Sequence, residues 1–307
     1  MAYIHDTTPG VDDSAVNRSE DANHARPDSK WKNTNNITPV ASRLWLTPLM
    51  FKAIRISILL AVLIIVAGTT WLTQQRTTDW DYSLWVRVYP INADNHPDND
   101  RHIDTLTDAS FDDIEQFIAT EAARYGVTTT DPVRIDLGRP ISEQPPALAE
   151  RPNVIDAIVW SLKMRWWAST VTEDQEDYQP DVRIFVRYHQ PATTMVLENS
   201  VGVRKGMFGI VNAYSGRAYR GRNSVVFAHE LLHTIGASDK YDPRTNQPIA
   251  PQGLGEPDRE PLYPQRIAEI MGGRIALSDT RAEMPRTLKQ AVIGQETARE
   301  IRLLDEG

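Results

Sequence analysis

An uncharged apolar run sets the first constraint on how this chain can fold. Residues 56–75 contain no Asp, Glu, Lys, Arg or His, and their centre reads ILLAVLIIVA. An apolar helix of about 20 residues crosses the hydrocarbon core of a bilayer. More than fifty residues precede the run, which argues against a cleaved signal peptide. A buried core helix is rarely apolar on every side. We therefore expect one transmembrane helix over residues 52–75.

Basic residues are distributed unevenly around this run. Bases at positions 43, 52 and 55 precede it, whereas Arg76 alone follows before Asp79. Lys and Arg are enriched in the short segments on the cytoplasmic side of a membrane. This asymmetry predicts a single-pass membrane protein with a cytoplasmic N-terminus. Residues 79–307 are then periplasmic or extracellular.

Composition narrows the remaining possibilities. Residues 1–51 are rich in Asp, Asn, Thr, Pro and Ser, which predicts a disordered cytoplasmic tail. The chain has no cysteine, so disulfides, cysteine nucleophiles and thiolate-bound zinc are excluded. The formal net charge is -8 and no cluster of Lys and Arg stands out, so we expect no nucleic-acid partner. Nothing in the sequence indicates an oligomeric state.

Residues 79–307 alternate between strand-like and helix-like segments. The pattern predicts strands at 84–90, 133–137, 182–188, 196–203 and 209–214. It predicts helices at 110–126, 152–168, 224–235 and 286–304, with a Pro-rich irregular loop at 242–264. The helix at 152–168 carries an apolar stripe that we assign to the core: Val154, Ile155, Ile158, Val159, Leu162 and Trp166. Such alternation favours an α/β domain with a mixed sheet.

An acidic stretch lies at residues 94–102 and contains two histidines, His96 and His102. Asp94, Asp98 and Asp100 are candidate calcium ligands, but their spacing matches no established calcium loop. We favour a solvated loop here.

The segment that indicates chemistry is FAHELLHTIG, residues 227–236. Helix residues four apart lie one above the other, so His229 and His233 can direct two imidazole nitrogens at one metal ion. Glu230 is placed about 100° round the helix from His229, where it can deprotonate a water held by the metal. The pattern is typical of zinc sites in metallopeptidases. The alternative is a pair of exposed histidines beside a solvated carboxylate.

Catalytic zinc takes three protein ligands and leaves the fourth position to water. Gly236 can end the helix in a left-handed conformation, after which the chain turns back. Asp239 follows His233 by six residues and is placed to supply the third ligand. Asp242 and Glu269 compete with it. Glu269 would suit a different zinc-peptidase design, in which a second helix supplies a Glu and no glycine is needed at 236.

The stretch HELLHTIGASD resembles the metzincin pattern, His-Glu-x-x-His-x-x-Gly-x-x-His, with Asp replacing the last His. Snapalysin-type secreted peptidases use this Asp variant. The resemblance covers about 45 residues. It implies a metzincin-like zincin domain that binds Zn²⁺, with these roles: ligands His229, His233 and Asp239, general base Glu230, and turn residue Gly236.

Metzincins also place a methionine turn beneath the zinc, and Met271 follows the irregular loop at a suitable distance. The family often has a tyrosine two residues beyond that methionine, where this chain has Gly273. Tyr241 and Tyr263 are candidate substitutes. By the same analogy, the region at 202–214 is expected to hold an edge strand beside the cleft that offers backbone groups to an extended peptide.

The expected function is therefore that of a membrane-anchored zinc-dependent endopeptidase acting on a peptide or protein substrate. One alternative is a membrane-tethered domain in which zinc serves binding or scaffolding without peptidase activity, although an intact Glu230 argues against it. Intramembrane proteolysis is disfavoured because the zinc helix lies far along the chain from the span at 52–75.

Overall fold

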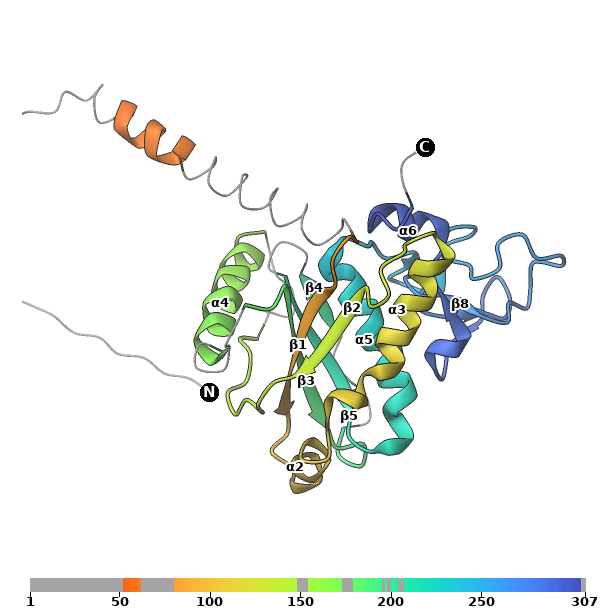
Figure 1. The fold of residues 1–307 in the computed structure, drawn as a ribbon, viewed down its shortest axis with the longest axis horizontal. Helices are drawn as coiled ribbons and strands as arrows, with labels where there is room; N and C mark the ends of the chain where they lie inside the picture. The colour runs from red at the N-terminus through yellow and green to blue at the C-terminus, as the bar shows by residue number, and fades with distance from the viewer. Residues whose placement is uncertain are drawn as a thin grey trace, which may run out of the picture. The chain divides into compact units, whose positions relative to one another are not determined.

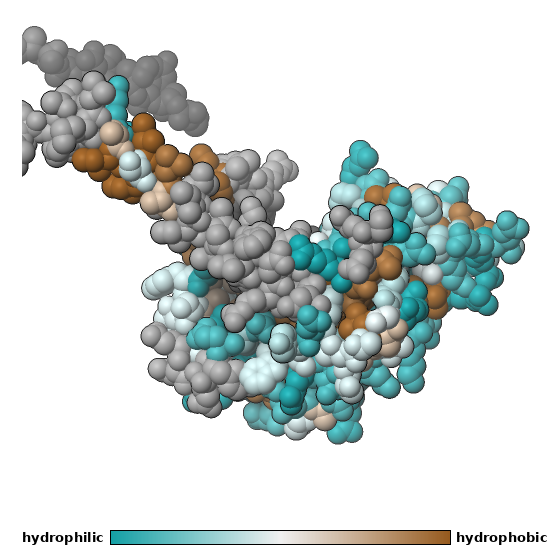
Figure 2. Space-filling view, turned by 45° about the horizontal axis from the view of Figure 1, so that its top comes forward, coloured by the Kyte–Doolittle hydropathy of each residue, from teal (hydrophilic) through white to brown (hydrophobic). Residues whose placement is uncertain are grey.

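The computed structural model describes residues 52–61, 80–147, 154–172, 179–194, 197, 200–203 and 207–304. The predicted tail (1–51) and residues 62–75 of the predicted span lie outside this set. Residues 52–61 are helical and expose apolar side chains, which appear brown in Figure 2. Within the described ranges, no helix is both long and apolar enough to cross a membrane. The transmembrane helix therefore stays a prediction.

A five-stranded sheet lies at the centre of residues 80–304, with strand order β2-β1-β3-β5-β4 (Figure 1). Four strands run parallel: β1 (Leu84–Asn92), β2 (Val133–Leu137), β3 (Val182–His189) and β5 (Phe208–Tyr214). The short strand β4 (Val201–Val203) pairs antiparallel with β5 at one edge. The predicted α/β domain with a mixed sheet is confirmed.

Helices cover both faces of this sheet (Figure 1), as expected for parallel strands. Side chains alternate between the faces of a strand, so β3 contributes Ile184 to one core and Phe185 to the other. On the Ile184 side the sheet packs against α3 (Asp112–Arg124) and α5 (Arg220–Ile235). On the Phe185 side it packs against α4 (Val154–Thr172), with the rings of Phe185 and Trp167 4.8 Å apart. α5 begins one turn earlier than predicted.

The predicted core face of α4 is wrong. Met164, Trp167 and Ala168 are the buried side chains of this helix. Five residues of the predicted stripe are exposed to solvent, with fractions between 44% and 73%: Ile155, Ile158, Val159, Leu162 and Trp166. α4 is apolar on two opposite sides, so periodicity alone could not identify the side that contacts the sheet.

The acidic stretch at 94–102 is not a loop. It contains helix α2 (Pro97–Ile103), with proline in the first turn and the His96 ring accepting a hydrogen bond from Asp98 N. Its three candidate calcium ligands accept hydrogen bonds from protein groups: Asp94 from Gln190 N, Asp98 from Gln190 Nε2, and Asp100 from Asn92 Nδ2. They form no metal-binding group among the described residues.

The C-terminal part is mostly irregular, with short pairs of strands and 3₁₀ turns. The strands are β6 (Tyr241–Asp242), β7 (Gln247–Pro248), β8 (Ala268–Glu269), β9 (Ile275–Ala276), β10 (Ala282–Glu283) and β11 (Ala291–Val292). The 3₁₀ turn in this part is η5 (Leu288–Gln290); η1 (Asp108–Ser110) precedes α3, and η4 (Arg217–Tyr219) precedes α5. The predicted helix at 286–304 is wrong: the only α-helix described there is the short α6 (Gln295–Glu300). The preceding residues instead pair with β8 as strand β11.

Candidate metal centre

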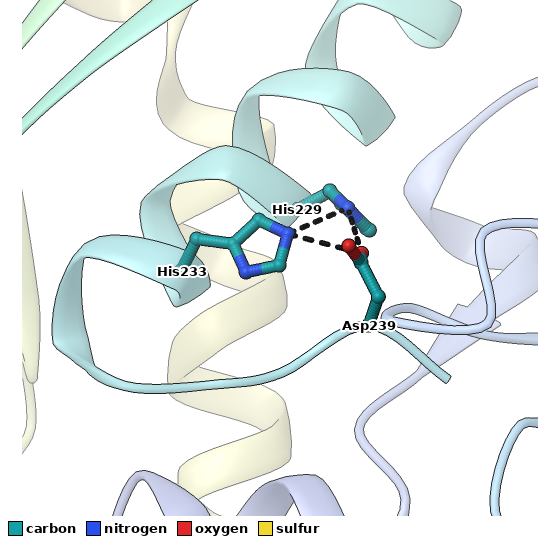
Figure 3. Close-up of side chains that lie close together, drawn as sticks. All are labelled: His229, His233 and Asp239. Carbon is teal, nitrogen blue, oxygen red and sulfur yellow. Dashed lines mark hydrogen bonds and ion pairs between the residues drawn. The ribbon is translucent and has the colours of Figure 1, made fainter. Parts of the chain in front are cut away.

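Three side chains from one helix and the loop after it converge on a single point (Figure 3). His229 and His233 project from adjacent turns of α5, and their Nε2 atoms lie 3.1 Å apart. Oδ1 of Asp239 lies 3.2 Å from the first of these nitrogens and 3.1 Å from the second. The structure therefore brings together the three predicted ligands, and it gathers no other such group among the described residues.

Backbone carbonyls orient both imidazoles. Nδ1 of His229 lies 2.9 Å from the carbonyl oxygen of Ile270, and Nδ1 of His233 lies 2.9 Å from that of Ala237. In the neutral tautomer that donates from Nδ1, the Nε2 atom carries a lone pair. In this tautomer, two lone pairs and a carboxylate oxygen point at one another. This arrangement calls for a cation.

The spacing fits zinc. Tetrahedral zinc bound at its usual distances to nitrogen and oxygen holds its ligand atoms about 3.3 Å apart. The observed separations of 3.1–3.2 Å are close to this value. An outer carbonyl that fixes the tautomer of a ligating imidazole is also a usual feature of zinc sites. His229, His233 and Asp239 thus suit a zinc ion and leave a fourth position for water.

The turn after α5 returns the chain to the histidines. Gly236 has a φ of 125°, which glycine adopts without strain. The backbone N–H groups of Gly236 and Ala237 both donate to the carbonyl of Leu232, closing the helix end. The chain then places Asp239 opposite the two imidazoles. As predicted, Gly236 is the residue at which the direction reverses.

The histidines and Asp239 influence one another's ionisation. Burial opposes the charged form of Asp239, but hydrogen bonds from His229 and His233 outweigh it and hold its pKa well below the usual range. Burial also opposes protonation of His229, yet Asp239, Glu230 and the Ile270 carbonyl raise its pKa. The site therefore has a negative potential that attracts a cation.

Met271 lies in the segment beneath the site and is completely buried. Its carbonyl accepts a hydrogen bond from the backbone N–H of Lys240, 2.9 Å away, so it holds the residue next to Asp239. Ile270, which precedes it, orients His229. The Met271 segment thus positions one histidine and the third carboxylate through its backbone.

Glu269 is buried beside this segment but does not join the three converging groups. One carboxylate oxygen accepts from Gly272 N at 2.7 Å. The other accepts from Gly294 N at 3.0 Å and from Thr297 Oγ1 at 2.8 Å. Glu269 therefore ties the turn after Met271 to α6. The competing assignment of Glu269 as third ligand gains no support.

The other candidates fall in different places. Asp242 accepts from the backbone N–H of Arg244 at 2.8 Å and forms a turn outside the cluster. Tyr241 lies close to the site, with its ring centre 6.3 Å from that of His229. Tyr263 does not line the pocket at the site. Gly273 has a φ of 68° and continues the turn.

Sequence reasoning missed an ion pair beside the third ligand. Lys240 is 5% exposed, and its Nζ lies 2.7 Å from Oε2 of Glu300 in α6. The same carboxylate accepts from the backbone N–H of Ser238 at 2.9 Å. Glu300 therefore holds both neighbours of Asp239. Glu300 lies 60 residues beyond Lys240, and no local pattern links the two.

Glu230 is buried and lines a pocket of about 610 Å³ together with His229. Ser200, Asn212 and Tyr214 line the same pocket from the β4 and β5 side of the sheet. The pocket thus extends from His229 and Glu230 towards the β4 edge of the sheet. A separate cavity of about 500 Å³, lined by Phe111 and Phe227, contains none of the three converging ligands.

No protein-family model matches this chain, and no curated protein is significantly similar to it.

Proposed function

We propose that this protein is a membrane-anchored, zinc-dependent endopeptidase with a metzincin-like site. The observation that carries the proposal is the convergence of His229, His233 and Asp239, whose facing atoms lie 3.1–3.2 Å apart. A pocket beside this point supplies room for a substrate. The anchor is the apolar run within residues 52–75, which is followed within a few residues by the start of the α/β domain.

The proposed chemistry assigns one proton-transfer group. A bound zinc ion supplies positive charge that polarises the scissile carbonyl and makes water more acidic. Glu230 is not one of the three ligands and lies in the pocket wall beside His229. Its carboxylate takes the proton of the attacking water and then passes it to the leaving amine.

The substrate would bind along the edge of the sheet. β4 pairs with β5 on one side, and in the described part of the chain the sheet ends there. An extended peptide can add to such an edge through backbone hydrogen bonds. Because Ser200, Asn212 and Tyr214 near this edge line the Glu230 pocket, a peptide bound there would reach the metal centre.

The experiment is metal analysis of the purified full chain together with hydrolysis of a mixed fluorogenic peptide library. We expect one zinc ion per chain, loss of hydrolysis with a chelator, and recovery on adding zinc. Zinc binding without hydrolysis of any peptide would favour the scaffold alternative. A chain that purifies and titrates without zinc would contradict the metal centre itself.

A further inference from the structure

α4 carries a second apolar face that the domain does not bury. The outer stripe, defined as Ile155, Ile158, Val159, Leu162 and Trp166, is well exposed, with Trp166 73% and Leu162 61% accessible. At about 100° per residue, these five positions fall within an arc of about 100° on the helix. They form one continuous strip opposite Met164 and Trp167, which face the sheet.

The composition of this face is that of an interfacial helix. Lys163 and Arg165 are exposed and lie on either side of the strip on the helical wheel. Bases beside an apolar strip favour anionic lipid headgroups, and tryptophan favours the boundary between headgroups and acyl chains. The packing of the core does not require this strip, because the opposite face of α4 already covers the sheet.

The predicted membrane span lies close in sequence to the start of the α/β domain. Residue 80 is the first described residue of the domain, and only four residues separate it from the end of the apolar run at Gln75. Even fully extended, this linker spans about 17 Å. β1 begins at Leu84, and one end of α4 lies at the same end of the sheet (Figure 1). A membrane anchor at residues 52–75 would therefore keep residue 80, just before β1, within about 17 Å of the lipid.

We propose that the outer stripe of α4 lies in the headgroup region of the membrane that residues 52–75 anchor. The inference rests on the anchor in the proposed function. A second copy of the chain is a poorer occupant. The strip is about 17 Å long and one helix wide, far below the ~800 Å² per partner that specific interfaces bury.

Because the chain has no cysteine, a single introduced cysteine is the only residue that a thiol-reactive fluorophore labels. Leu162→Cys carries an environment-sensitive fluorophore on the strip, and Ile158→Cys repeats the measurement if the first variant misfolds. Ile249→Cys is the matched control, because Ile249 is an exposed aliphatic residue in the C-terminal region. The full chain is reconstituted in vesicles of phosphatidylcholine and phosphatidylglycerol. Quenching of the fluorophore is measured with nitroxide-bearing lipids and, separately, with iodide present on both sides of the vesicle membrane.

We expect lipid-borne nitroxide to quench the Leu162→Cys label at least about threefold more than the Ile249→Cys label, with iodide showing the reverse order. Equal quenching of both labels in chains that float with the vesicles would overturn this inference and leave the anchor standing. Protection from both quenchers, with crosslinks between chains, would overturn it in favour of a second copy. Chains that fail to float with the vesicles would overturn both the anchor and the inference. None of these readouts depends on peptidase activity.

Discussion

Nδ1 of His229 lies 2.9 Å from the carbonyl oxygen of Ile270, 41 residues further along the chain. This contact fixes which nitrogen of His229 faces Asp239 and His233. The turn formed by the residues after Ile270 therefore sets the geometry of the candidate metal centre without supplying a ligand. Outer groups of this kind affect metal affinity strongly in characterised zinc sites.

Gly272→Ala should damage the metal centre, whereas Gly273→Ala should not. A Cβ at position 272 would lie 2.2 Å from the carbonyl oxygen of Gly253, so the backbone must shift. A Cβ at position 273 meets no atom within 4 Å and adds only the strain of a positive φ, about 1 kcal/mol. We expect the first variant to lose at least about tenfold in zinc affinity. Zinc titration and thermal unfolding check this, and equal behaviour of the two variants would refute the role of the turn.

Asp239→Ala should lower zinc affinity strongly, because it removes one of three converging ligands. Glu269→Gln should leave zinc binding nearly unchanged. The variant should still lose about 1–3 kcal/mol of folding stability, because its amide N–H₂ would face at least one of the three groups that now donate to the Glu269 carboxylate. Competition titration with a zinc indicator separates the two. If Glu269→Gln lost zinc and Asp239→Ala kept it, the ligand assignment would have to be reversed.

Glu300→Gln should destabilise the protein in a pH-dependent way. Burial opposes ionisation of Glu300, but hydrogen bonds from Lys240 and Ser238 prevail and hold its pKa below the ordinary value of 4.5. A carboxyl group whose pKa is lower in the folded state than in the unfolded state stabilises the fold at pH values above the unfolded-state pKa. This stabilisation is lost as the pH falls through the folded-state pKa. At neutral pH the variant removes the carboxylate charge beside the buried Lys240 ammonium, which keeps only its contacts with Ser238, a loss of about 2 kcal/mol.

Denaturant unfolding of the parent and the Glu300→Gln variant between neutral and acid pH measures this difference. The difference in unfolding free energy between the parent and the variant should be largest above about pH 5. It should shrink below about pH 4.5, as Glu300 becomes protonated. Arg299→Gln is a control on the neighbouring residue, whose exposed pair with Glu296 is worth little. A gap that stayed constant with pH would exclude ionisation of Glu300 as its cause.

The local part of the metal centre could be predicted from spacing alone. His229, His233, Gly236 and Asp239 lie within 11 consecutive residues, where the helical repeat and one glycine turn determine their relative positions. The parallel strands were also predictable, because their β-branched and apolar runs are buried on both faces.

Non-local contacts explain what the sequence pattern missed. β11 forms where residues 291–292 pair with β8, and Ile293 N donates to Glu121, so a helix at 286–304 would lose these bonds. The pairing of Lys240 with Glu300 likewise depends on where α6 packs. On α4, both sides are apolar, and the Phe185 surface selects Trp167 over Trp166.

The topology of the chain can be tested with a reporter that is active only outside the cytoplasm. Fused after Gly307, it should be active, because bases at positions 43, 52 and 55 precede the apolar run. A cytoplasmic reporter at the same position should be silent. The reverse pattern would contradict both the orientation and the periplasmic or extracellular location of the domain.

The most direct test of a zinc peptidase centred on Glu230 is the variant Glu230→Gln in the full chain. The amide keeps the size of the buried side chain but cannot accept a proton at neutral pH. General-base assistance is worth about 10²–10⁴-fold. We predict that the variant binds one zinc ion with the affinity of the parent and hydrolyses peptides at least about a hundredfold more slowly. Loss of zinc together with activity would make Glu230 a ligand, and full activity with zinc bound would contradict its role as general base.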